Sequence, residues 1–513
     1  MDVLGGGPGG LYAARLLKLR HPECRVRVFE QSEPAATFGF GVGLATRTQR
    51  NLDAADPETF AAIVAGSWPH ELSMSVGGRQ VILAVDNLFA IGRSTLLDIL
   101  RRHAAAAGVE FRYGVRVGAD DLDADLVIAA DGVSSGTREA RAEVFGARVD
   151  VHRGLYLWAG TDVALPRAVF TPVRTEYGSF VAHAYPYASD RSTFLIETDE
   201  ETWRRAGFDV STERLPFDAD DEHSLAYLSD AFSEHLQGHR LIGNRTRWLR
   251  FRTVSCDRWH DGNLVLLGDA AHTAHYSIGS GTKLAMEGGI ALDAAIAAAG
   301  DLEEALVRYE QGRRPAVEHL QETATRSMNW WDSFPTRLDL PVEQLLVSYM
   351  TRAGKVSVDR FASSAPDVVR TALARYAGCG ESQVDVSALT DWALRQPLTR
   401  AGHRFGSRRV QAADIPGLRP VEVRLTDPWG SDADALVKGV ADAVGNDQAW
   451  SGVLLSAAPE SGSVLTMFDV AERIRREVGA LVVAQLDAGD TELAVAALVS
   501  ERVDLVELTE RAA

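Results

Sequence analysis

Three groups of residues in this chain have the types and spacing that cofactor chemistry needs. The first is a glycine-rich turn at residues 5–10, which reads Gly-Gly-Gly-Pro-Gly-Gly, fits the pattern G-x-G-x-x-G and follows a short apolar strand. In that pattern Gly5 permits a tight turn, Gly7 lets a pyrophosphate approach the backbone, and Gly10 permits close helix packing. Glu30 closes the next predicted strand, where a carboxylate can bind a ribose diol. We therefore expect a dinucleotide site, the alternative being a purely structural turn.

The second group is an apolar strand at residues 126–130 that ends in Asp131-Gly132. It overlaps residues 132–136, which read Gly-Val-Ser-Ser-Gly and match the G-x-S-x-G nucleophile elbow of serine hydrolases. A hydrolase would need an acid and then a histidine downstream, but it would have no use for a nucleotide turn near the N-terminus. A serine-rich turn between a strand and a helix therefore accounts for this motif better than a nucleophile does.

The third group follows an apolar strand at residues 264–267. The strand ends in Gly-Asp, and a carboxylate there, Asp269, suits a polyol hydroxyl, although it could instead cap a helix. A glycine-rich loop at 279–281 then opens a helix, whose N-terminus suits a developing anion. His272 and His275 lie between these features and are either general bases or structural histidines.

The predicted elements around these groups form an α/β fold. The chain opens with a βαβ unit, and alternation of apolar and polar residues between 155 and 198 predicts an antiparallel sheet. A parallel-type strand returns before a long helix that begins near residue 281. The predicted strands are 2–4, 25–30, 156–160, 179–185, 192–197 and 264–267, and the predicted helices include 10–20, 94–107 and 303–331.

The sequence changes in character after residue 395. Proline and glycine cluster between 397 and 420, which predicts a linker or a long loop. Strands and helices then alternate, as is typical of half a βα barrel or of a small doubly wound sheet. The expected strands are 421–425, 452–456, 480–485 and 503–508, and the expected helices are 432–444, 465–478 and 491–500.

Composition and charge narrow the class of protein. The 513 residues carry 53 Lys and Arg against 71 Asp and Glu, a formal net charge of −18, which argues against nucleic acid or an anionic membrane as the main partner. Three dispersed cysteines argue against a disulfide framework and against a metal site. The N-terminus has no leader pattern and no window approaches the ~20 apolar residues of a membrane span, so we expect a cytoplasmic protein.

The order of the three motifs resembles that of the single-component FAD-dependent aromatic monooxygenases, relatives of p-hydroxybenzoate hydroxylase, over about residues 1–375. The resemblance is greatest to the branch of salicylyl-CoA 5-hydroxylase and anthraniloyl-CoA monooxygenase. It is carried by residues 158–161, 183–186, 200–203 and 272–283, which read WAGT, HAYP, EETW and HTAHYSIGSGTK. Many relatives place proline in the loop after the Gly-Asp motif, whereas this chain, like that branch, has His-Tyr-Ser there.

This resemblance implies a role for each motif. The FAD pyrophosphate would lie on the glycine turn, the adenosine ribose on Glu30, and the ribityl chain on Asp269. The Asp-Gly motif would support FAD and a passing nicotinamide cofactor, and N–H groups of the 279–281 loop would face the flavin pyrimidine. The implied cofactor-binding residues are Gly5, Gly7, Gly10, Glu30, Arg93, Asp131, Gly132, Asp269, Gly279 and Gly281. The expected catalytic positions are His275, Tyr276 and Gly279.

The reaction expected from this resemblance is the hydroxylation of an aromatic ring. NADH or NADPH would dock transiently, since no second nucleotide turn is present, and the reduced flavin would form a C4a-hydroperoxide with O₂. That electrophile needs an electron-rich ring, such as C5 of a 2-amino- or 2-hydroxybenzoyl thioester on CoA or on an aryl carrier protein. The alternatives are a hydroxylase of a free aromatic such as tryptophan and a non-catalytic flavin-binding protein. The Trp-x-Trp-x-Ile-Pro segment of flavin halogenases is absent.

We expect four parts in the chain. The C-terminal part resembles a truncated old-yellow-enzyme-like barrel without a flavin of its own, or is an unrelated βα module; its shortness favours a specialised biosynthetic enzyme, as in antibiotic biosynthesis. Arginines 204, 205, 245, 247, 250 and 252 either bind thioester phosphates or form a solvated face. The expected parts are an FAD-binding domain at 1–75, 90–150 and 257–310, a substrate-binding sheet domain at 76–89 and 151–256, a helical region at 311–395, and a C-terminal βα unit at 396–513.

Overall fold

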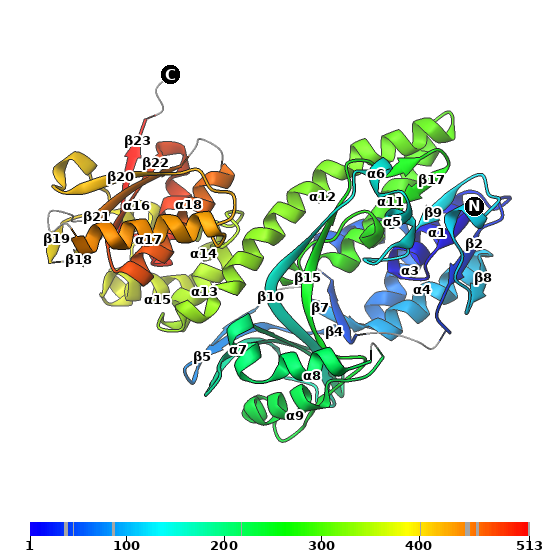
Figure 1. The fold of residues 1–513 in the computed structure, drawn as a ribbon, viewed down its shortest axis with the longest axis horizontal. Coiled ribbons are helices and arrows are strands. Elements are labelled where there is room, and N and C mark those ends of the chain that lie inside the picture. The colour runs from blue at the N-terminus through cyan, green and yellow to red at the C-terminus, as the bar shows by residue number, and fades with distance from the viewer. Residues whose placement is uncertain are drawn as a thin grey trace. The chain divides into compact units, whose positions relative to one another are not determined.

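The computed structural model describes residues 1–34, 39–44, 46–84, 88–216, 218–400, 402–446, 452–457 and 461–510. The chain divides into two compact units (Figure 1), the first made of Met1–Ser73 and Ile82–Met328 and the second of Met74–Val81 and Asn329–Ala513. A mostly parallel sheet, an antiparallel sheet, a helical region and a C-terminal βα unit are all present. The predicted fold class is therefore confirmed.

The first unit contains a six-stranded sheet in the order β16-β17-β9-β1-β2-β8. The five strands from β17 to β8 run parallel, and β16 is antiparallel to β17. Every residue of the central strands β1, β9 and β17 is buried, as in parallel sheets that are covered on both faces. The strands are β1 (Asp2–Leu4), β2 (Arg27–Glu30), β8 (Glu110–Tyr113), β9 (Val127–Ala129), β16 (His260–Asp261) and β17 (Leu264–Leu266).

Helices and a small second sheet surround these strands. The first helix begins at Pro8 rather than at residue 10, because proline is well suited to a first helical turn. The helices are α1 (Pro8–Arg20), α2 (Thr46–Ala55), α3 (Pro57–Ala65), α4 (Arg93–Ala107), α5 (Gly136–Ala140), α6 (Ala142–Phe145) and α11 (Gly281–Ala298). The small sheet consists of β3 (Gly41–Leu44), β7 (Phe89–Gly92) and β4 (Trp68–Pro69).

Glycines allow α1 and α11 to pack closely. A Cβ atom at Gly9 would lie 3.0 Å from the Cβ of Ala285, and one at Gly289 would lie 3.1 Å from the backbone nitrogen of Ala13. Larger side chains at these positions would push the two helices apart. Because α1 follows β1 and α11 follows β17, this packing brings two helix N-termini to the same edge of the parallel sheet.

The antiparallel sheet of the first unit has an apolar and a polar face. Its strands follow the order β14-β10-β13-β12-β11, and β15 pairs with β10. Alternate residues such as Phe180, Phe194 and Ile196 pack with helix residues such as Phe208 and Leu228 in one core. The strands are β10 (Arg148–Thr161), β11 (Ala168–Thr175), β12 (Gly178–Ala188), β13 (Arg191–Thr198), β14 (Leu241–Ile242) and β15 (Trp248–Ser255); the helices are α7 (Glu200–Arg205), α8 (Phe208–Arg214), α9 (Glu222–Ala231) and α10 (Ser233–Leu236); β5 (Leu72–Val76) and β6 (Arg79–Leu83) are neighbouring strands.

The second unit combines helices with a four-stranded parallel sheet in the sequential order β20-β21-β22-β23. Buried Arg337 pairs with buried Glu472 at 2.5 Å, joining the helical part to the βα part. The helices are α13 (Val342–Thr351), α14 (Val358–Ser364), α15 (Pro366–Ala377), α16 (Leu389–Leu394), α17 (Ser431–Asn446), α18 (Ser461–Arg473) and α19 (Thr491–Val499), preceded by the long α12 (Leu302–Asp332). The strands are β20 (Leu418–Val423), β21 (Gly452–Ala457), β22 (Leu481–Asp487) and β23 (Leu505–Thr509).

The prediction of a linker or long loop after residue 395 is wrong in part. The strands β18 (Leu398–Arg400) and β19 (His403–Phe405) pair there as a short antiparallel hairpin. Gly402 has a φ of +77° in its turn, a conformation that glycine adopts without strain. The glycine that suggested a loop is thus the residue that lets the chain reverse.

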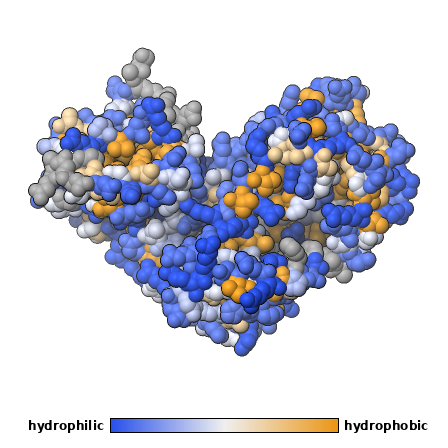
Figure 2. Space-filling view, viewed as in Figure 1, coloured by the Kyte–Doolittle hydropathy of each residue, from blue (hydrophilic) through white to orange (hydrophobic). Residues whose placement is uncertain are grey.

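One face of the molecule is mostly polar. Figure 2 shows hydrophilic residues over most of the visible face, with small hydrophobic patches among them. Within the described ranges, no helix is long and apolar enough to cross a membrane.

Asp56 links two helices of the first unit. Its Oδ1 accepts a hydrogen bond from the Thr59 backbone at 3.2 Å, which caps α3, and its Oδ2 lies 2.5 Å from Nε of Arg15 on α1. The Arg15 and Asp56 side chains are each only 3% exposed. Burial raises the pKa of Asp56, but hydrogen bonds from Arg15 and Thr59 outweigh it and lower the pKa overall. The carboxylate is therefore ionised at neutral pH.

We predict that Asp56→Ala lowers the free energy of unfolding by about 3–5 kcal/mol, because it leaves the buried Arg15 guanidinium without its carboxylate. Urea denaturation followed by tryptophan fluorescence measures the loss. Glu58→Gln is the matched control: Glu58 also binds Arg15, at 2.8 Å, but is 76% exposed. Glu58→Gln should lower the free energy of unfolding by less than about 1 kcal/mol. Equal decreases for the two variants would contradict this account.

Candidate active site

The ends of four parallel strands place the predicted cofactor residues along one edge of the sheet. Leu4 of β1 pairs with Phe29 of β2 and with Ala129 of β9, which pairs with Leu266 of β17, so the four strands end level. The residues that follow or close these strands include Gly5, Glu30, Asp131 and Asp269. In open parallel sheets ligands bind outside the carboxyl ends of the strands.

The glycine turn combines two packed glycines with an open one. Gly5 has a φ of +102°, and a Cβ atom there would lie 2.2 Å from the carbonyl oxygen of Ala130. A Cβ atom at Gly10 would lie 2.2 Å from the carbonyl oxygen of Gly5, whereas one at Gly7 would meet nothing within 4 Å. Gly5 and Gly10 therefore hold the turn against the sheet, and Gly7 faces open space at the start of α1.

Glu30 is fixed beside this turn. Its Oε2 accepts a hydrogen bond from the backbone nitrogen of Gly6 at 2.7 Å, and its Oε1 accepts one from Ser32 at 2.8 Å. A carboxylate oxygen has lone pairs for more than one donor, so both oxygens can still accept bonds from hydroxyl groups. The structure thus places the carboxylate where the ribose site is expected.

The loop after β9 presents Asp131. Its Oδ2 accepts hydrogen bonds from the backbone nitrogen of Thr137 at 3.2 Å and from its hydroxyl at 3.0 Å. Its Oδ1 is buried without a partner among the residues the structure describes. In the G-x-S-x-G segment the buried hydroxyl of Ser135 caps α5 by accepting a bond from the Arg138 backbone at 3.0 Å, and Ser134 is exposed. These serines make a helix start, which agrees with the structural interpretation.

Arg138 connects this loop to the loop after β17. Its buried guanidinium donates hydrogen bonds to the carbonyl oxygens of Val133 at 2.7 Å, Ala270 at 3.0 Å and Asp269 at 3.3 Å. These three donated bonds satisfy much of the hydrogen-bonding capacity of the buried cation. The motif analysis did not identify Arg138, because two of its three partners, Asp269 and Ala270, lie 131 and 132 positions away along the chain.

Asp269 and Arg93 lie close enough to influence each other's charge. Burial raises the pKa of Asp269, while Arg93 and Arg138 act in the opposite direction. Burial lowers the pKa of Arg93, and Asp269 opposes this effect. Asp269 lies inside the 3₁₀ turn Gly268–Ala270 rather than at a helix cap position, so the capping alternative does not apply.

The two loop histidines differ in their surroundings. His272 is 2% exposed, packs 5.0 Å from the Trp259 ring, and neither of its ring nitrogens has a hydrogen-bond partner among the described residues. Burial lowers the pKa of both His272 and His275 to about 3. Nδ1 of His275 accepts a bond from the backbone nitrogen of Ser277 at 3.3 Å, which assigns the ring proton to Nε2. His275 is thus a neutral hydrogen-bond donor at ordinary pH.

Tyr276 brings this loop against the antiparallel sheet. Its ring lies 4.8 Å from that of Tyr156, 5.8 Å from Phe251 and 6.4 Å from Trp158, and His275 is 4.0 Å away. Such tilted and edge contacts are favourable between aromatic rings. The predicted catalytic positions His275 and Tyr276 therefore belong to one aromatic cluster with strands β10 and β15.

Two buried polar residues of this sheet were not predicted as site residues. His183 of β12 and Glu197 of β13 are 8% and 9% exposed, and Nε2 of His183 lies 3.5 Å from Oε2 of Glu197. Burial raises the pKa of Glu197, but the neighbouring His183 and a hydrogen bond from the Tyr276 hydroxyl outweigh this effect and lower the pKa. The sequence did contain a signal for these residues, because residues alternate between the two faces of a strand. Polar or aromatic residues occupy the positions between those that form the apolar core.

Glycines and polar atoms along the sheet edge fit an extended ligand such as FAD. Cβ atoms at Gly132, Gly279 or Gly281 would meet nothing within 4 Å, as at Gly7, so the backbone is open to close approach at each loop. The hydroxyl of Ser280, at the start of α11, is buried without a partner among the described residues. In the same ranges no cluster of His, Cys, Asp and Glu could hold a metal ion.

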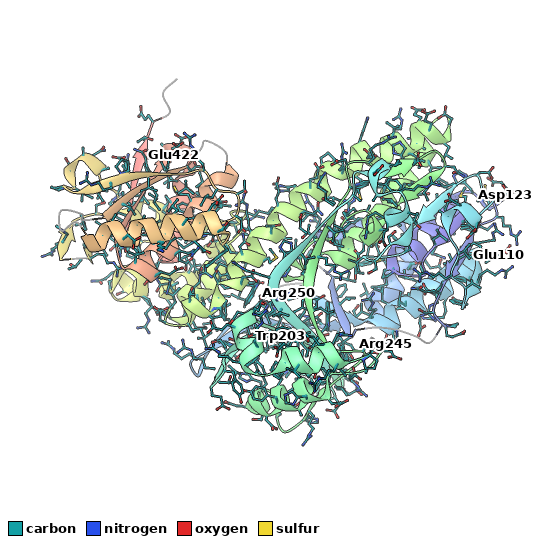
Figure 3. All side chains as sticks on the ribbon, in the orientation of Figure 1. Glu110, Asp123, Trp203, Arg245, Arg250 and Glu422 are labelled. Carbon is teal, nitrogen blue, oxygen red and sulfur yellow. The ribbon has the colours of Figure 1, made fainter. Side chains whose placement is uncertain are left out.

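The six arginines of the possible basic site are spread over the sheet and its helices. Arg204 and Arg250 both pair with Glu200, at 2.5 and 2.9 Å, and Arg205 pairs with Glu201 at 3.2 Å. Arg250 and Arg245 lie well apart in Figure 3. These pairings favour a solvated charged face over a single phosphate site.

Comparisons with known proteins agree with this geometry. A family model described as an FAD binding domain matches residues 84–324. The chain is 36% identical to a salicyloyl-CoA 5-hydroxylase from Streptomyces sp over 98% of both chains. It is 39% identical to 3-hydroxy-4-methyl-anthranilyl-(aryl-carrier protein) 5-monooxygenase from Streptosporangium sibiricum, over 69% of this chain and 94% of that protein.

A solved structure supports the fold independently. The structure of a variant of 2-methyl-3-hydroxypyridine-5-carboxylic acid oxygenase matches with a TM-score of 0.52 at 20% identity, covering 69% of this chain and 96% of that chain. At that identity the match concerns the fold alone. This shared fold and the similarity over nearly the full length of salicyloyl-CoA 5-hydroxylase together identify the family of the chain. The chain belongs to the family of FAD-dependent aromatic monooxygenases that includes salicyloyl-CoA 5-hydroxylase.

Proposed function

We propose that this enzyme hydroxylates C5 of a 2-amino- or 2-hydroxybenzoyl thioester, using FAD, NADH or NADPH, and O₂. The observation that carries the proposal is the contact between the two halves of the site: Tyr276, from the loop that follows Asp269, packs against Tyr156 of the antiparallel sheet. This contact gives an aromatic substrate a buried, partly polar surface next to the loops that fit a flavin. Two relatives carry names that describe hydroxylation or monooxygenation at position 5, one of a salicyloyl group on CoA and one of an anthranilyl group on an aryl-carrier protein.

The residues along the sheet edge would hold FAD. The N-terminus of α1 at Gly7 would receive the pyrophosphate, because free backbone N–H groups and the helix dipole favour anions. Glu30 would accept bonds from the adenosine ribose, and Asp269 would bind the ribityl chain. Arg93 would approach the flavin from the start of α4, with Asp131 and Gly132 supporting the cofactor from the loop after β9. When bound, reduced FAD would activate O₂ so that one oxygen atom is transferred to an electron-rich ring.

The loop before α11 would approach the flavin ring. Gly279 has a φ of +60° and ends the turn Tyr276–Ile278, and Gly281 begins α11. Both positions are open to close approach. The N–H group of Gly279 is already donated to the carbonyl oxygen of Tyr276 at 2.8 Å, so the N–H group of Gly281, in the first turn of α11, would be the one that stabilises negative charge on the ring. His275 would hold this loop through Ser277 and donate through Nε2; it would not remove a proton.

The substrate ring would be attacked at the carbon para to its donor. In a 2-amino- or 2-hydroxybenzoyl group C5 is para to the amino or hydroxyl group, which makes it electron-rich. The half-buried aromatic cluster around Tyr276 would hold the ring and help to exclude water. CoA and an aryl carrier protein present the same thioester, and the experiment below distinguishes them.

The C-terminal βα unit would be a remnant of an old-yellow-enzyme-like barrel. Its four strands follow one another in sequential parallel order, as in a segment of a βα barrel. A doubly wound sheet instead reverses its strand order at a switch point, where ligands bind. The sequential order therefore supports the barrel interpretation over the doubly wound one.

We predict that a thioester accelerates reduction of the bound FAD by NADH at least about tenfold, equivalent to lowering the barrier by ~1.4 kcal/mol. Stopped-flow absorbance compares anthraniloyl-CoA, salicyloyl-CoA, the corresponding carrier-protein thioesters, free anthranilate and tryptophan. Acceleration by CoA esters alone, or by carrier-protein esters alone, identifies the group to which the aromatic acid is attached. Acceleration by tryptophan or free anthranilate but by no thioester would contradict the proposal.

We predict that His275 contributes no step to the pH dependence of kcat/KM. Because burial lowers its pKa to about 3, the ring is neutral above that pH and cannot produce a step near the ordinary histidine pKa of about 6.5. Asparagine offers an acceptor near the position of Nδ1, so His275→Asn should give a profile parallel to that of the wild type. A limb between about pH 6 and pH 7 that the variant loses would show that His275 acts as a base.

A further inference from the structure

Glu197 is a buried carboxylate for which the reaction described above has no use. It lies on β13 directly opposite Tyr156 of β10 and Val181 of β12, so these three side chains share one face of the sheet. The neighbouring positions Ile196 and Thr198 point to the other face, where Ile196 enters the apolar core. Glu197 therefore belongs to the face that Tyr276 contacts.

Only part of this carboxylate is used by the protein. Oε2 lies 3.5 Å from Nε2 of His183, and the Tyr276 hydroxyl also hydrogen-bonds the carboxylate. Oε1 is buried and has no hydrogen-bond partner in the described part of the chain. A buried charged oxygen without a donor costs free energy, and native proteins rarely leave one so. The arrangement points to a donor supplied by a ligand.

The charge of Glu197 is retained at the pH at which such enzymes work. Its pKa is lowered because the neighbouring His183 and a hydrogen bond from the Tyr276 hydroxyl outweigh the effect of burial. An ionised carboxylate can only accept hydrogen bonds, and bonds to charged groups are stronger than neutral ones. The free oxygen is therefore specific for an N–H or O–H group and offers nothing to a ring without one.

Electrophilic attack at C5 depends on the donor group para to it. A carboxylate that accepts a hydrogen bond from the amino or hydroxyl group draws its proton outward, so that more lone-pair density enters the ring and reaches C5. The same bond fixes the rotation of the ring, since the thioester and the donor occupy adjacent carbons. One carboxylate can thus contribute to both orientation and reactivity.

Resting on the proposed function, we propose that Oε1 of Glu197 accepts a hydrogen bond from the ring amino or hydroxyl group of the substrate. Glu197 is then the residue that selects donor-substituted rings and points C5 towards the flavin. The aromatic rings around it, Tyr156 and Tyr276 among them, would pack against the substrate ring.

The test is a comparison of two ligands across two proteins. Dissociation constants of 2-aminobenzoyl and unsubstituted benzoyl thioesters are measured from the perturbation of the flavin absorbance in the holoenzyme, for the wild type and for Glu197→Gln. The wild type should prefer the amino ligand by about 10- to 100-fold, as expected for a hydrogen bond to a charged group. In Glu197→Gln this preference should fall at least about fivefold, while binding of the benzoyl ligand changes little. The yield of hydroxylated product per NADH should fall with it.

Glu310→Gln is the matched control. Glu310 is also 9% exposed and accepts a bond from the Trp259 backbone at 2.8 Å, so its substitution disturbs a buried carboxylate elsewhere in the first unit. This variant should keep the wild-type preference. An unchanged preference in Glu197→Gln, or an equal loss in both variants, would overturn the inference.

Failure of the proposed function gives a different result. If no thioester perturbs the wild-type flavin, the proposed substrate is wrong, and the inference that rests on it is overturned too. If Glu197→Gln does not retain FAD, the test uses the two dissociation constants of the wild type alone. Equal affinities for the amino and benzoyl ligands would overturn the role of Glu197. A preference of about tenfold or more for the amino ligand would support it.

Discussion

Arg138 donates hydrogen bonds from one buried guanidinium to two loops that follow different strands of the parallel sheet, at Val133 and at Ala270. The first loop carries Asp131 and the second carries Asp269 and leads to Tyr276. A buried cation of this kind must keep its acceptors, because leaving it or the carbonyl groups unpaired costs several kcal/mol, on the order of 3–5. The spacing of the two loops is therefore fixed by this side chain, and the positions along the sheet edge depend on it.

The antiparallel sheet has one polar and aromatic face, because apolar and polar residues alternate along its strands. This face lies against the loop that carries Tyr276. Each strand gives its apolar residues, such as Phe180 and Ile196, to the core beneath helices α7–α10. The intervening residues Tyr156, His183 and Glu197 are left on the side that Tyr276 reaches. One sheet thus supplies both the apolar core of the domain and the surface proposed for the substrate. A substitution on one face of the sheet can therefore disturb the residues on the other face.

The sequence predicted the local features of the fold well, and the long-range contacts poorly. The glycine turn, the Asp-Gly and Gly-Asp strand ends and most element positions follow from short motifs and periodicity. Arg138 could not be found in this way, since its role depends on partners that only the fold brings near. Alternation could place Glu197 on the face opposite the apolar core, but its contact with His183 depends on the fold. The linker or long loop predicted after residue 395 is wrong only where the chain forms a short hairpin, because Gly402 can serve a hairpin turn as well as a loop.

The central claim is that the loop carrying Tyr276 and the polar face of the sheet hold an aromatic thioester with C5 towards the flavin. Turnover of 2-aminobenzoyl thioester with NADH under ¹⁸O₂, followed by mass spectrometry and NMR of the product, tests it most directly. The account predicts a single ¹⁸O atom on C5. A hydroxyl group at another ring carbon, an oxygen derived from water, or consumption of NADH with only hydrogen peroxide formed would contradict it.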